Sequence, residues 1–189
     1  MKRVGILGGT FNPPHLGHLW IAEEVRIAME LEEIWFIPTY TPPHKDESKI
    51  DASDRLNMLD LAIRDNEYFK LNTIELERKG KSYTLQTIKE LKMKYSDHEF
   101  CFIIGADMVE YLPNWYKIDE LMELIRFIGV KRFGYKLETS YPIITVDIPM
   151  VDISSSMIRE RIFNERSVKY MLPDPVYRYI REYKLYENR

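Results

Sequence analysis

Short runs of apolar residues alternate with amphipathic segments along most of the chain. Continuous apolar runs predict buried strands near residues 3–7, 34–37, 69–76, 100–104, 127–131 and 143–147. Apolar residues at helical spacing predict helices over 19–29, from 51 or 53 to 63, over 82–95 and 118–126, after 155, and from 174. Wholly apolar strands that alternate with helices are typical of a parallel sheet covered on both faces. We therefore expect an α/β fold, a Rossmann-like doubly wound parallel sheet flanked by helices.

The organisation of the chain predicts a single domain over residues 1–189. No internal repeat, linker or shift in composition divides it, and 189 residues with 45% apolar content can bury one core. We expect the C-terminal helices, about 154–189, to pack on this domain. An aromatic tail could pack on its own domain or on a partner, and the sequence does not choose; its members are Tyr177, Tyr179, Ile180, Tyr183, Leu185 and Tyr186.

Charge and cysteine content narrow the classes of function. With 27 Lys+Arg against 30 Asp+Glu, the net charge of -3 argues against a surface for DNA or RNA backbones. The single cysteine, Cys101, allows no intramolecular disulfide and sits in an apolar strand, so we expect an inert core residue. His98 stands between two acidic residues, and we expect it at the surface. No apolar run has the length of a signal peptide or membrane span, so we expect a cytoplasmic protein.

The first strand ends in the segment that carries the strongest chemical signal. Residues 8–18 read Gly-Gly-Thr-Phe-Asn-Pro-Pro-His-Leu-Gly-His. Glycines let a backbone approach a bulky anion, and a helix start presents N–H groups to phosphate. His15 and His18 are three apart, so a helix starting near Pro14 places both imidazoles on one side, where they could clamp a polyphosphate.

Other interpretations of this segment have less support. Glycine-rich turns between a strand and a helix are common in α/β folds for structural reasons. The motifs Gly-x-Gly-x-x-Gly and Gly-x-x-x-x-Gly-Lys are absent, and so is the zinc motif His-Glu-x-x-His. Packing alone does not explain two histidines and paired prolines in so short a loop. We therefore expect a phosphate site.

Two segments far apart resemble the signatures of one superfamily. Gly9-Thr10-Phe11 with His15-Leu16-Gly17-His18 resembles the (T/H)xGH signature of the nucleotidyltransferases, which join a nucleotide to a phosphorylated acceptor and release pyrophosphate. Residues 153–159, Ile-Ser-Ser-Ser-Met-Ile-Arg, resemble the second signature, which holds the ATP triphosphate in that superfamily. Asn12 stands where Asp is usual and Ser156 where Thr is common. Both retain hydrogen-bonding capacity, but a carboxylate role at position 12 is excluded.

Further segments resemble the bacterial nicotinate-nucleotide adenylyltransferases: Pro42-Pro43-His44-Lys45, Ser82-Tyr83-Thr84, Ile104-Gly105-Ala106-Asp107-Met108, Asn114-Trp115-Tyr116 and Val130-Lys131-Arg132. This resemblance implies an enzyme of NAD biosynthesis whose partners are ATP and nicotinate mononucleotide. The acceptor phosphate would attack the ATP α-phosphate in line, giving nicotinate adenine dinucleotide (deamido-NAD) and pyrophosphate. Mg²⁺ would bridge ATP phosphates, and no metal site formed by protein side chains is implied.

The resemblance also implies the role of each site residue. His15 and His18 are the expected catalytic residues. The expected ATP-binding residues are Gly8, Gly9, Thr10, Phe11, His15, His18, Gly105, Asp107, Ile153, Ser154, Ser155, Ser156 and Arg159. The expected acceptor-binding residues are His44, Lys45, Tyr83, Thr84, Met108, Trp115, Tyr116 and Arg132.

Several of these residues also have structural interpretations. Asp107 could be a helix N-cap, Trp115 a half-buried packing residue, and residues 82–84 a helix cap. His44 and Lys45 could belong to a solvated loop.

Alternative functions remain open at the level of sequence. Another adenylyl- or cytidylyltransferase of the superfamily is one, for example a phosphopantetheine adenylyltransferase. A non-catalytic nucleotide-binding regulator is another, although both histidines, Asp107 and Arg159 are all present. A homo-oligomer is also possible, with a dimer the first expectation.

Overall fold

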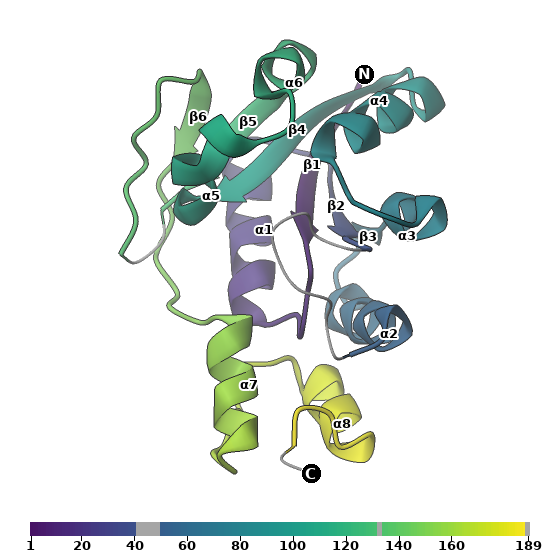
Figure 1. Cartoon of the computed structure of the whole chain (residues 1–189), viewed down its shortest axis with the longest axis vertical. Coiled ribbons are helices and arrows are strands. Elements are labelled where there is room, and N and C mark those ends of the chain that lie inside the picture. The colour runs from purple at the N-terminus through teal and green to yellow at the C-terminus, as the bar shows by residue number, and fades with distance from the viewer. Residues whose placement is uncertain (41–49, 132–133, 188–189) are drawn as a thin grey trace.

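The computed structural model describes residues 1–40, 50–131 and 134–187, which include one six-stranded sheet (Figure 1). The strands are β1 (Lys2–Gly9), β2 (Glu33–Pro38), β3 (Phe69–Leu71), β4 (His98–Gly105), β5 (Arg126–Val130) and β6 (Ile143–Val146). Their order is β3-β2-β1-β4-β5-β6, and every neighbouring pair is parallel. This order is that of the doubly wound Rossmann fold. The expected fold class is confirmed.

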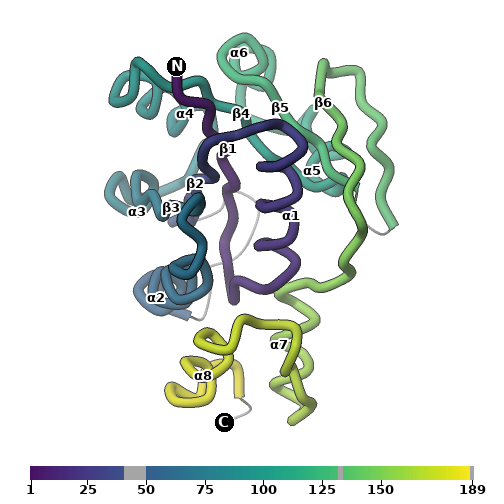
Figure 2. The backbone as a smooth tube through the Cα atoms, turned by 180° about the vertical axis from the view of Figure 1, so that it is seen from behind, coloured from purple at the N-terminus to yellow at the C-terminus, as the bar shows by residue number. Residues whose placement is uncertain are grey.

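Helices cover both faces of the sheet (Figures 1 and 2). They are α1 (Leu16–Ala28), α2 (Ala52–Ile63), α3 (Ile74–Arg78), α4 (Thr84–Lys94), α5 (Ala106–Tyr111), the 3₁₀ turn η1 (Leu112–Asn114), α6 (Ile118–Leu124), α7 (Ser155–Phe163) and α8 (Asp174–Glu182). Helices α1 and α2 bury side chains in one hydrophobic cluster, and α3 to α6 bury theirs in another. The two clusters lie on opposite faces because successive strand residues point to opposite sides.

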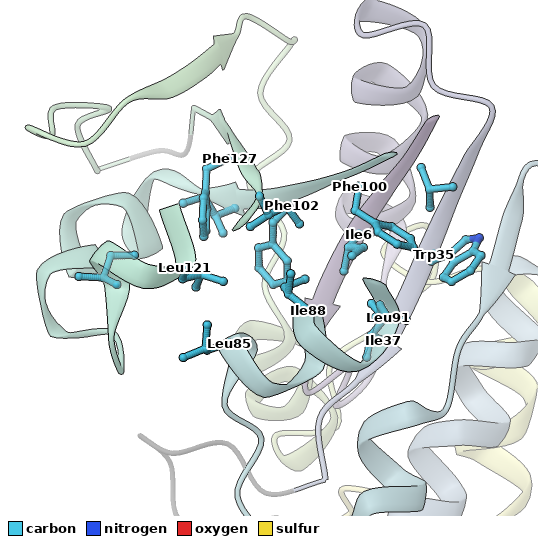
Figure 3. Close-up of a cluster of buried hydrophobic side chains, with 14 of the residues drawn as sticks. Ile6, Trp35, Ile37, Leu85, Ile88, Leu91, Phe100, Phe102, Leu121 and Phe127 are labelled. Carbon is cyan, nitrogen blue, oxygen red and sulfur yellow. The ribbon is translucent and has the colours of Figure 1, made fainter. Parts of the chain in front are cut away.

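Strand β4 shows this division directly. Its residues Phe100 and Phe102 belong to the cluster beneath α4, whereas Cys101 and Ile103 belong to the cluster beneath α1. Figure 3 shows Phe102 beside Ile88 of α4 in the first cluster. A strand buried on both faces needs apolar residues throughout, which explains its continuous apolar sequence. Cys101 is buried as expected, and this burial raises the pKa of its thiol.

A third hydrophobic cluster joins the C-terminal helices to α2. Met58 of α2 packs with Ile158 of α7 and with Val176 and Ile180 of α8. The aromatic tail therefore packs on its own chain, with Tyr177, Tyr179, Leu185 and Tyr186 against this cluster.

One predicted strand is shorter than expected. The apolar run over 69–76 predicts a single strand, but β3 ends at Leu71 and α3 begins at Ile74. The side-chain oxygen of Asn72 accepts a hydrogen bond from the backbone N–H of Ile74 at 3.1 Å, an Asx turn that redirects the chain. The apolar residues after Leu71 therefore belong to a helix.

The stretch between Gly105 and Ile118 holds α5 and η1, for which the sequence predicts no bounds. These elements have six and three residues, which is too short for a clear helical period. Each contributes buried apolar residues, Ala106 and Val109 from α5 and Leu112 from η1.

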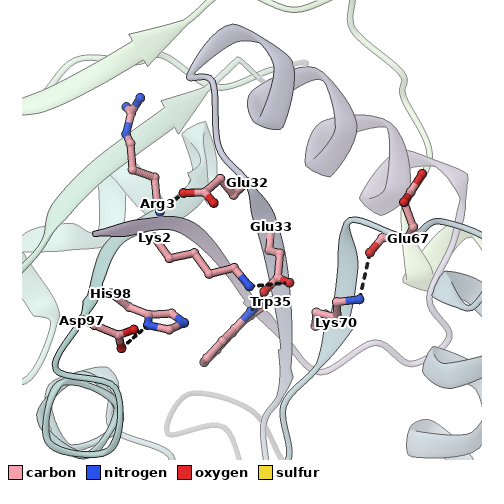
Figure 4. Close-up of polar contacts among 9 residues, drawn as sticks. All are labelled: Lys2, Arg3, Glu32, Glu33, Trp35, Glu67, Lys70, Asp97 and His98. Carbon is pink, nitrogen blue, oxygen red and sulfur yellow. Dashed lines mark hydrogen bonds and ion pairs between the residues drawn. The ribbon is translucent and has the colours of Figure 1, made fainter.

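The prediction that His98 lies at the surface is wrong. His98 begins β4, and its side chain is largely covered by the rings of Trp35, Tyr95 and Phe100. Figure 4 shows it at the amino ends of the strands, where its Nδ1 lies 2.8 Å from an Asp97 carboxylate oxygen. In the same view Lys2 pairs with Glu33, which also accepts the indole N–H of Trp35. The acidic neighbours of His98 indicate a side chain exposed to solvent, whereas the alternation of side chains along β4 directs its ring inward.

Candidate active site

A cleft of about 1970 Å³ lies at the carboxyl ends of β1 and β4, where the strand order reverses. This is where ligands bind in doubly wound sheets. Every predicted site residue that the structure describes lines it: Gly8, Gly9, Thr10, Phe11, His15, His18, Tyr83, Thr84, Gly105, Asp107, Met108, Trp115, Tyr116, Ile153, Ser154, Ser155, Ser156 and Arg159. His44, Lys45 and Arg132 lie outside the described residues. The fold thus brings together segments from five parts of the chain.

The loop after β1 turns sharply around a buried ring. Phe11 has a left-handed backbone, with φ of 49°, and its side chain is buried against Phe36 of β2. A Cβ atom at Gly9 would lie 3.2 Å from the Phe11 ring, which explains a glycine there. The turn exposes Gly8 to the cleft, so a ligand can approach the backbone closely.

The two histidines lie on one side of the first turn of α1, as predicted. His15 is the N-cap residue, and its ring stacks on that of His18 with centroids 3.7 Å apart. The backbone N–H of His15 donates to Nδ1 of His18 at 3.2 Å. Since Nδ1 accepts this hydrogen bond, a neutral His18 carries its proton on Nε2. His18 can therefore present a donor on Nε2.

Gly17 is required by the His15 ring. A Cβ atom at position 17 would lie 3.0 Å from Nδ1 and 3.1 Å from Cε1 of His15. His15 is only 5% exposed, so its ring has little room to move. The spacing His-x-Gly-His therefore keeps the two imidazoles stacked at the start of the helix.

The second signature touches the first. The hydroxyl of Ser155, the first residue of α7, donates to the carbonyl of Pro13 at 2.8 Å. The guanidinium of Arg159 donates to the carbonyl of Asn12 at 2.8 Å. Ser154 caps α7 by accepting from the N–H of Met157. Phosphate binding by these side chains stays a prediction, and in the structure Ser155 and Arg159 fix the loop after β1.

Asn12 is also held by the C-terminal tail. The phenol of Tyr186 donates to Oδ1 of Asn12 at 2.6 Å, and burial raises the pKa of this phenol. An amide oxygen accepts this hydrogen bond as a carboxylate would, which fits the Asn found at this position. Tyr186 lines the cleft, a role that sequence analysis missed because an aromatic tail has no site signature.

Aromatic side chains form the opposite part of the cleft wall. The rings of Tyr83 and Tyr116 lie 4.8 Å apart, and Trp115 contacts Phe102 and Phe127 edge-on at 5.9 and 5.8 Å. Trp115 is half-buried, so the packing interpretation holds, and its stacking on a ligand stays a prediction. Residues 82–84 include the N-cap of α4, Tyr83, as the structural interpretation has it, but the Tyr83 side chain makes no capping bond.

Asp107 lies in the first turn of α5 and lines the cleft. The N-cap of α5 is Gly105, so the interpretation of Asp107 as an N-cap is wrong. A carboxylate here sits at the carboxyl end of β4, next to the loop after β1. Its part in ligand binding stays a prediction.

Two buried charged residues in the cleft wall were missed by sequence analysis. Arg55 of α2 is 2% exposed and Glu75 of α3 is 6% exposed. Burial raises the pKa of Glu75, an effect partly opposed by the hydroxyls of Thr87 and Ser82. The sequence does carry a signal for Arg55, because it lies three residues before Met58 and four before Leu59, both buried. This spacing places a cation on the apolar face of α2.

A metal centre formed by side chains is not found among the described residues. No group of three or more His, Cys, Asp or Glu side chains within residues 1–40, 50–131 and 134–187 could hold an ion. Over the same residues, no helix is both long and apolar enough to traverse a bilayer.

Comparison with known proteins finds relatives over the full length of the chain. The family model for cytidylyltransferase-like proteins matches residues 6–161. A probable nicotinate-nucleotide adenylyltransferase from Oceanobacillus iheyensis is 59% identical over 98% of this chain and 97% of its own length. The nicotinate-nucleotide adenylyltransferase of Bacillus subtilis is 52% identical over the full length of both chains.

A solved structure shares the fold. Plasmodium falciparum nicotinic acid mononucleotide adenylyltransferase complexed with APC aligns over 98% of both chains with a TM-score of 0.83 and 22% identity. The same protein has been solved complexed with NaAD. With full-length relatives above half identity and both signatures meeting in one cleft, the chain belongs to the nicotinate-nucleotide adenylyltransferase family, nucleotidyltransferase enzymes of the cytidylyltransferase-like group.

Proposed function

We infer that this enzyme transfers the adenylyl group of ATP to nicotinate mononucleotide, giving nicotinate adenine dinucleotide and pyrophosphate in NAD biosynthesis. The observation that carries this conclusion is the direct contact between the two signatures. Ser155 and Arg159 bind the carbonyls of Pro13 and Asn12, in a chain whose full-length relatives bear that enzyme's name.

The chemistry needs positioning more than a base. The acceptor phosphate is already anionic near neutral pH, so the nucleophile needs no proton removed. The enzyme must align two anions for in-line attack and stabilise charge on the departing pyrophosphate. His18, with a donor on Nε2, and His15 beside it would contact the ATP phosphates, together with the N–H groups that open α1 and α7.

Nucleotidyltransferases generally use a divalent metal ion, and we propose Mg²⁺ for this one. Mg²⁺ is usually held by one or two carboxylates together with substrate phosphates. The donors in the cleft fit this pattern, since Asp107 offers a carboxylate and the described residues form no cage of three side chains. When bound, the ion would neutralise phosphate charge, and Asp107 would hold it directly or through water.

The acceptor would lie against the aromatic side of the cleft. Trp115 could stack on the pyridinium ring, a contact strengthened by cation–π attraction. Donors at the start of α4, near Tyr83 and Thr84, would bind the nicotinate carboxylate and so favour the acid over the amide. His44, Lys45 and Arg132 remain proposed phosphate or acceptor contacts, and Met108 and Tyr116 complete the proposed acceptor wall.

The cellular setting is also proposed. We place the enzyme in the cytoplasm, supported by the buried reduced Cys101 and the bacterial relatives. We also propose a single domain, since α7 and α8 share a hydrophobic cluster with α2, and a homodimer as the first assembly to test.

The test is pyrophosphate release with ATP and a panel of acceptors. Nicotinate mononucleotide should give rapid release, nicotinamide mononucleotide slower release, and phosphopantetheine none. Pyrophosphate release with phosphopantetheine and none with nicotinate mononucleotide would contradict this function and indicate a phosphopantetheine adenylyltransferase. Omitting Mg²⁺, with a chelator present, should abolish turnover.

A further inference from the structure

Arg55 is a buried cation in the cleft wall, and its hydrogen-bond partners among the described residues are backbone carbonyls. One terminal nitrogen of its guanidinium donates to the carbonyl of Thr10 at 2.9 Å and to that of Thr39 at 2.8 Å. The other donates to the carbonyl of Tyr40 at 3.2 Å. Arg55 thus joins the loop after β1 to the segment after β2.

The segment after β2 is also held from the aromatic side of the cleft. The backbone N–H of Tyr40 donates to the hydroxyl oxygen of Ser82 at 3.1 Å. Ser82 is buried and directly precedes Tyr83, the N-cap of α4. Tyr40 is therefore bonded through its carbonyl to the phosphate side of the cleft and through its N–H to the aromatic side.

Within residues 1–40, 50–131 and 134–187, no carboxylate forms an ion pair with Arg55, and its Nε is buried with no hydrogen-bond partner. Burial lowers the pKa of its guanidinium, but an arginine stays protonated at neutral pH. Burying a charge without a counterion is unfavourable unless other groups or a ligand compensate it.

The bound substrates would supply that compensation. The cleft that Arg55 lines also contains the loop after β1, and both proposed substrates carry phosphate. A fixed cation in a partly desolvated wall attracts anions more strongly than an exposed one. A carboxylate partner would cancel this field.

We propose that Arg55 is a positioning residue for adenylyl transfer, which holds the Thr10 and Tyr40 backbones in register and adds a positive field to the phosphate site. The effects on turnover that this inference predicts rest on the proposed function. The effect on affinity that it predicts concerns the binding of ATP alone.

Two substitutions separate the geometric from the electrostatic role. Arg55→Lys keeps the charge but cannot reach three carbonyls, so we expect kcat to fall roughly tenfold or more while KM for ATP stays within about threefold. Arg55→Met also removes the charge, so we expect KM for ATP to rise roughly tenfold in addition. Arg64→Met is the matched control and should match wild type, since Arg64, the C-cap residue of α2, lies at the surface paired with Asp60.

Ser82→Ala provides a second route that leaves the buried charge in place. It releases the N–H of Tyr40, and we expect kcat/KM of the folded enzyme for nicotinate mononucleotide to fall several-fold. The melting temperature should fall by a few degrees, because the hydroxyl also bonds Glu75. If Arg55→Met does not fold, Arg55→Lys and Ser82→Ala still test the geometric role.

Calorimetric measurement of ATP binding, with no acceptor present, distinguishes a failure of this inference from a failure of the proposed function. Wild type that binds ATP but gives no product with nicotinate mononucleotide contradicts the proposed function, whereas weaker ATP binding by Arg55→Met still supports the inference. Folded Arg55 variants with wild-type ATP affinity and kcat would overturn it. So would losses of activity that follow only the loss of folded protein.

Discussion

At the scale of single residues, the cleft uses side chains whose orientation is fixed by backbone contacts. The N–H of His15 assigns a tautomer to His18, and the carbonyls of Asn12 and Pro13 fix Arg159 and Ser155. Each contact joins a predicted site residue to the loop that it serves. These backbone contacts restrict the side chains of the site, which lowers the entropy lost on binding.

The tautomer of His18 gives a sharp test. In His18→Asn, the side-chain oxygen can still accept from the N–H of His15, but no donor remains at the position of Nε2. We expect kcat to fall by about 10² to 10³, as for the loss of one transition-state donor, with the melting temperature nearly unchanged. His18→Gln, which places an amide N–H near that position, should retain more activity than His18→Asn. Equal activity of the two variants would contradict the proposed role.

Glu75 predicts a pH-dependent effect on stability. Burial raises the pKa of Glu75 in the folded state above the ordinary 4.5. Its contribution to the free energy of unfolding is therefore fully present below that pH. As pH rises, the unfolded chain loses this proton first, and stability falls until the folded carboxyl ionises. Glu75→Gln removes this penalty. The difference in melting temperature between Glu75→Gln and wild type should therefore increase as the pH is raised above about 4.5, the ordinary pKa of a glutamate.

The control for this titration is Glu77→Gln, an exposed carboxyl on the same helix. The pH dependence of the melting temperature of Glu75→Gln is compared with that of this variant. A difference between Glu75→Gln and wild type that does not change with pH would contradict the raised pKa of Glu75.

At the scale of elements, the helix starts do most of the positioning. Helix α1 begins directly after His15 and α7 directly after Ser154, and both starts face the cleft. Between them, the Asx turn at Asn72 ends β3 early and places Glu75 on a helix rather than a strand. These boundaries decide which side chains line the cleft.

Gly17 tests the start of α1. Alanine there would favour the helix by up to about 1 kcal/mol, but its Cβ would crowd the ring of His15 at 3.0 Å. We expect Gly17→Ala to melt within a few degrees of wild type, because the two effects oppose each other, and to lose roughly tenfold in kcat. Ile27→Ala, at an exposed position of α1, should keep wild-type kcat. Full activity of Gly17→Ala would show that the His15 ring tolerates displacement.

At the scale of the whole molecule, the C-terminal helices complete both the core and the site. Val176 and Ile180 fill the third cluster beside Met58, and Tyr186 reaches back to Asn12. Figure 2 shows α7 and α8 side by side below the sheet, at the end where β1 leads into α1. The tail is thus a structural part of the active site.

Removal of residues 174–189 should therefore destabilise the protein severely. Burial of Val176 and Ile180 contributes about 3 to 6 kcal/mol together, comparable with the whole stability of a small domain. Thermal unfolding should show a large loss of cooperativity or no folded state. Tyr186→Phe isolates the hydrogen bond to Asn12, and should lose only about 1 kcal/mol while lowering kcat. Wild-type melting and activity of the truncated chain would refute this.

The sequence by itself determined the fold class, most strand and helix positions, and the segments that line the cleft. It could do so because apolar periodicity and glycine-rich turns are local signals. Only the tertiary structure decided what Arg55, Glu75, Tyr186 and His98 contact. Their partners lie far along the chain or were hidden by misleading neighbours, as the acidic residues beside His98 illustrate. Long-range contacts depend on how strands and helices pack, and a local pattern carries no record of that packing.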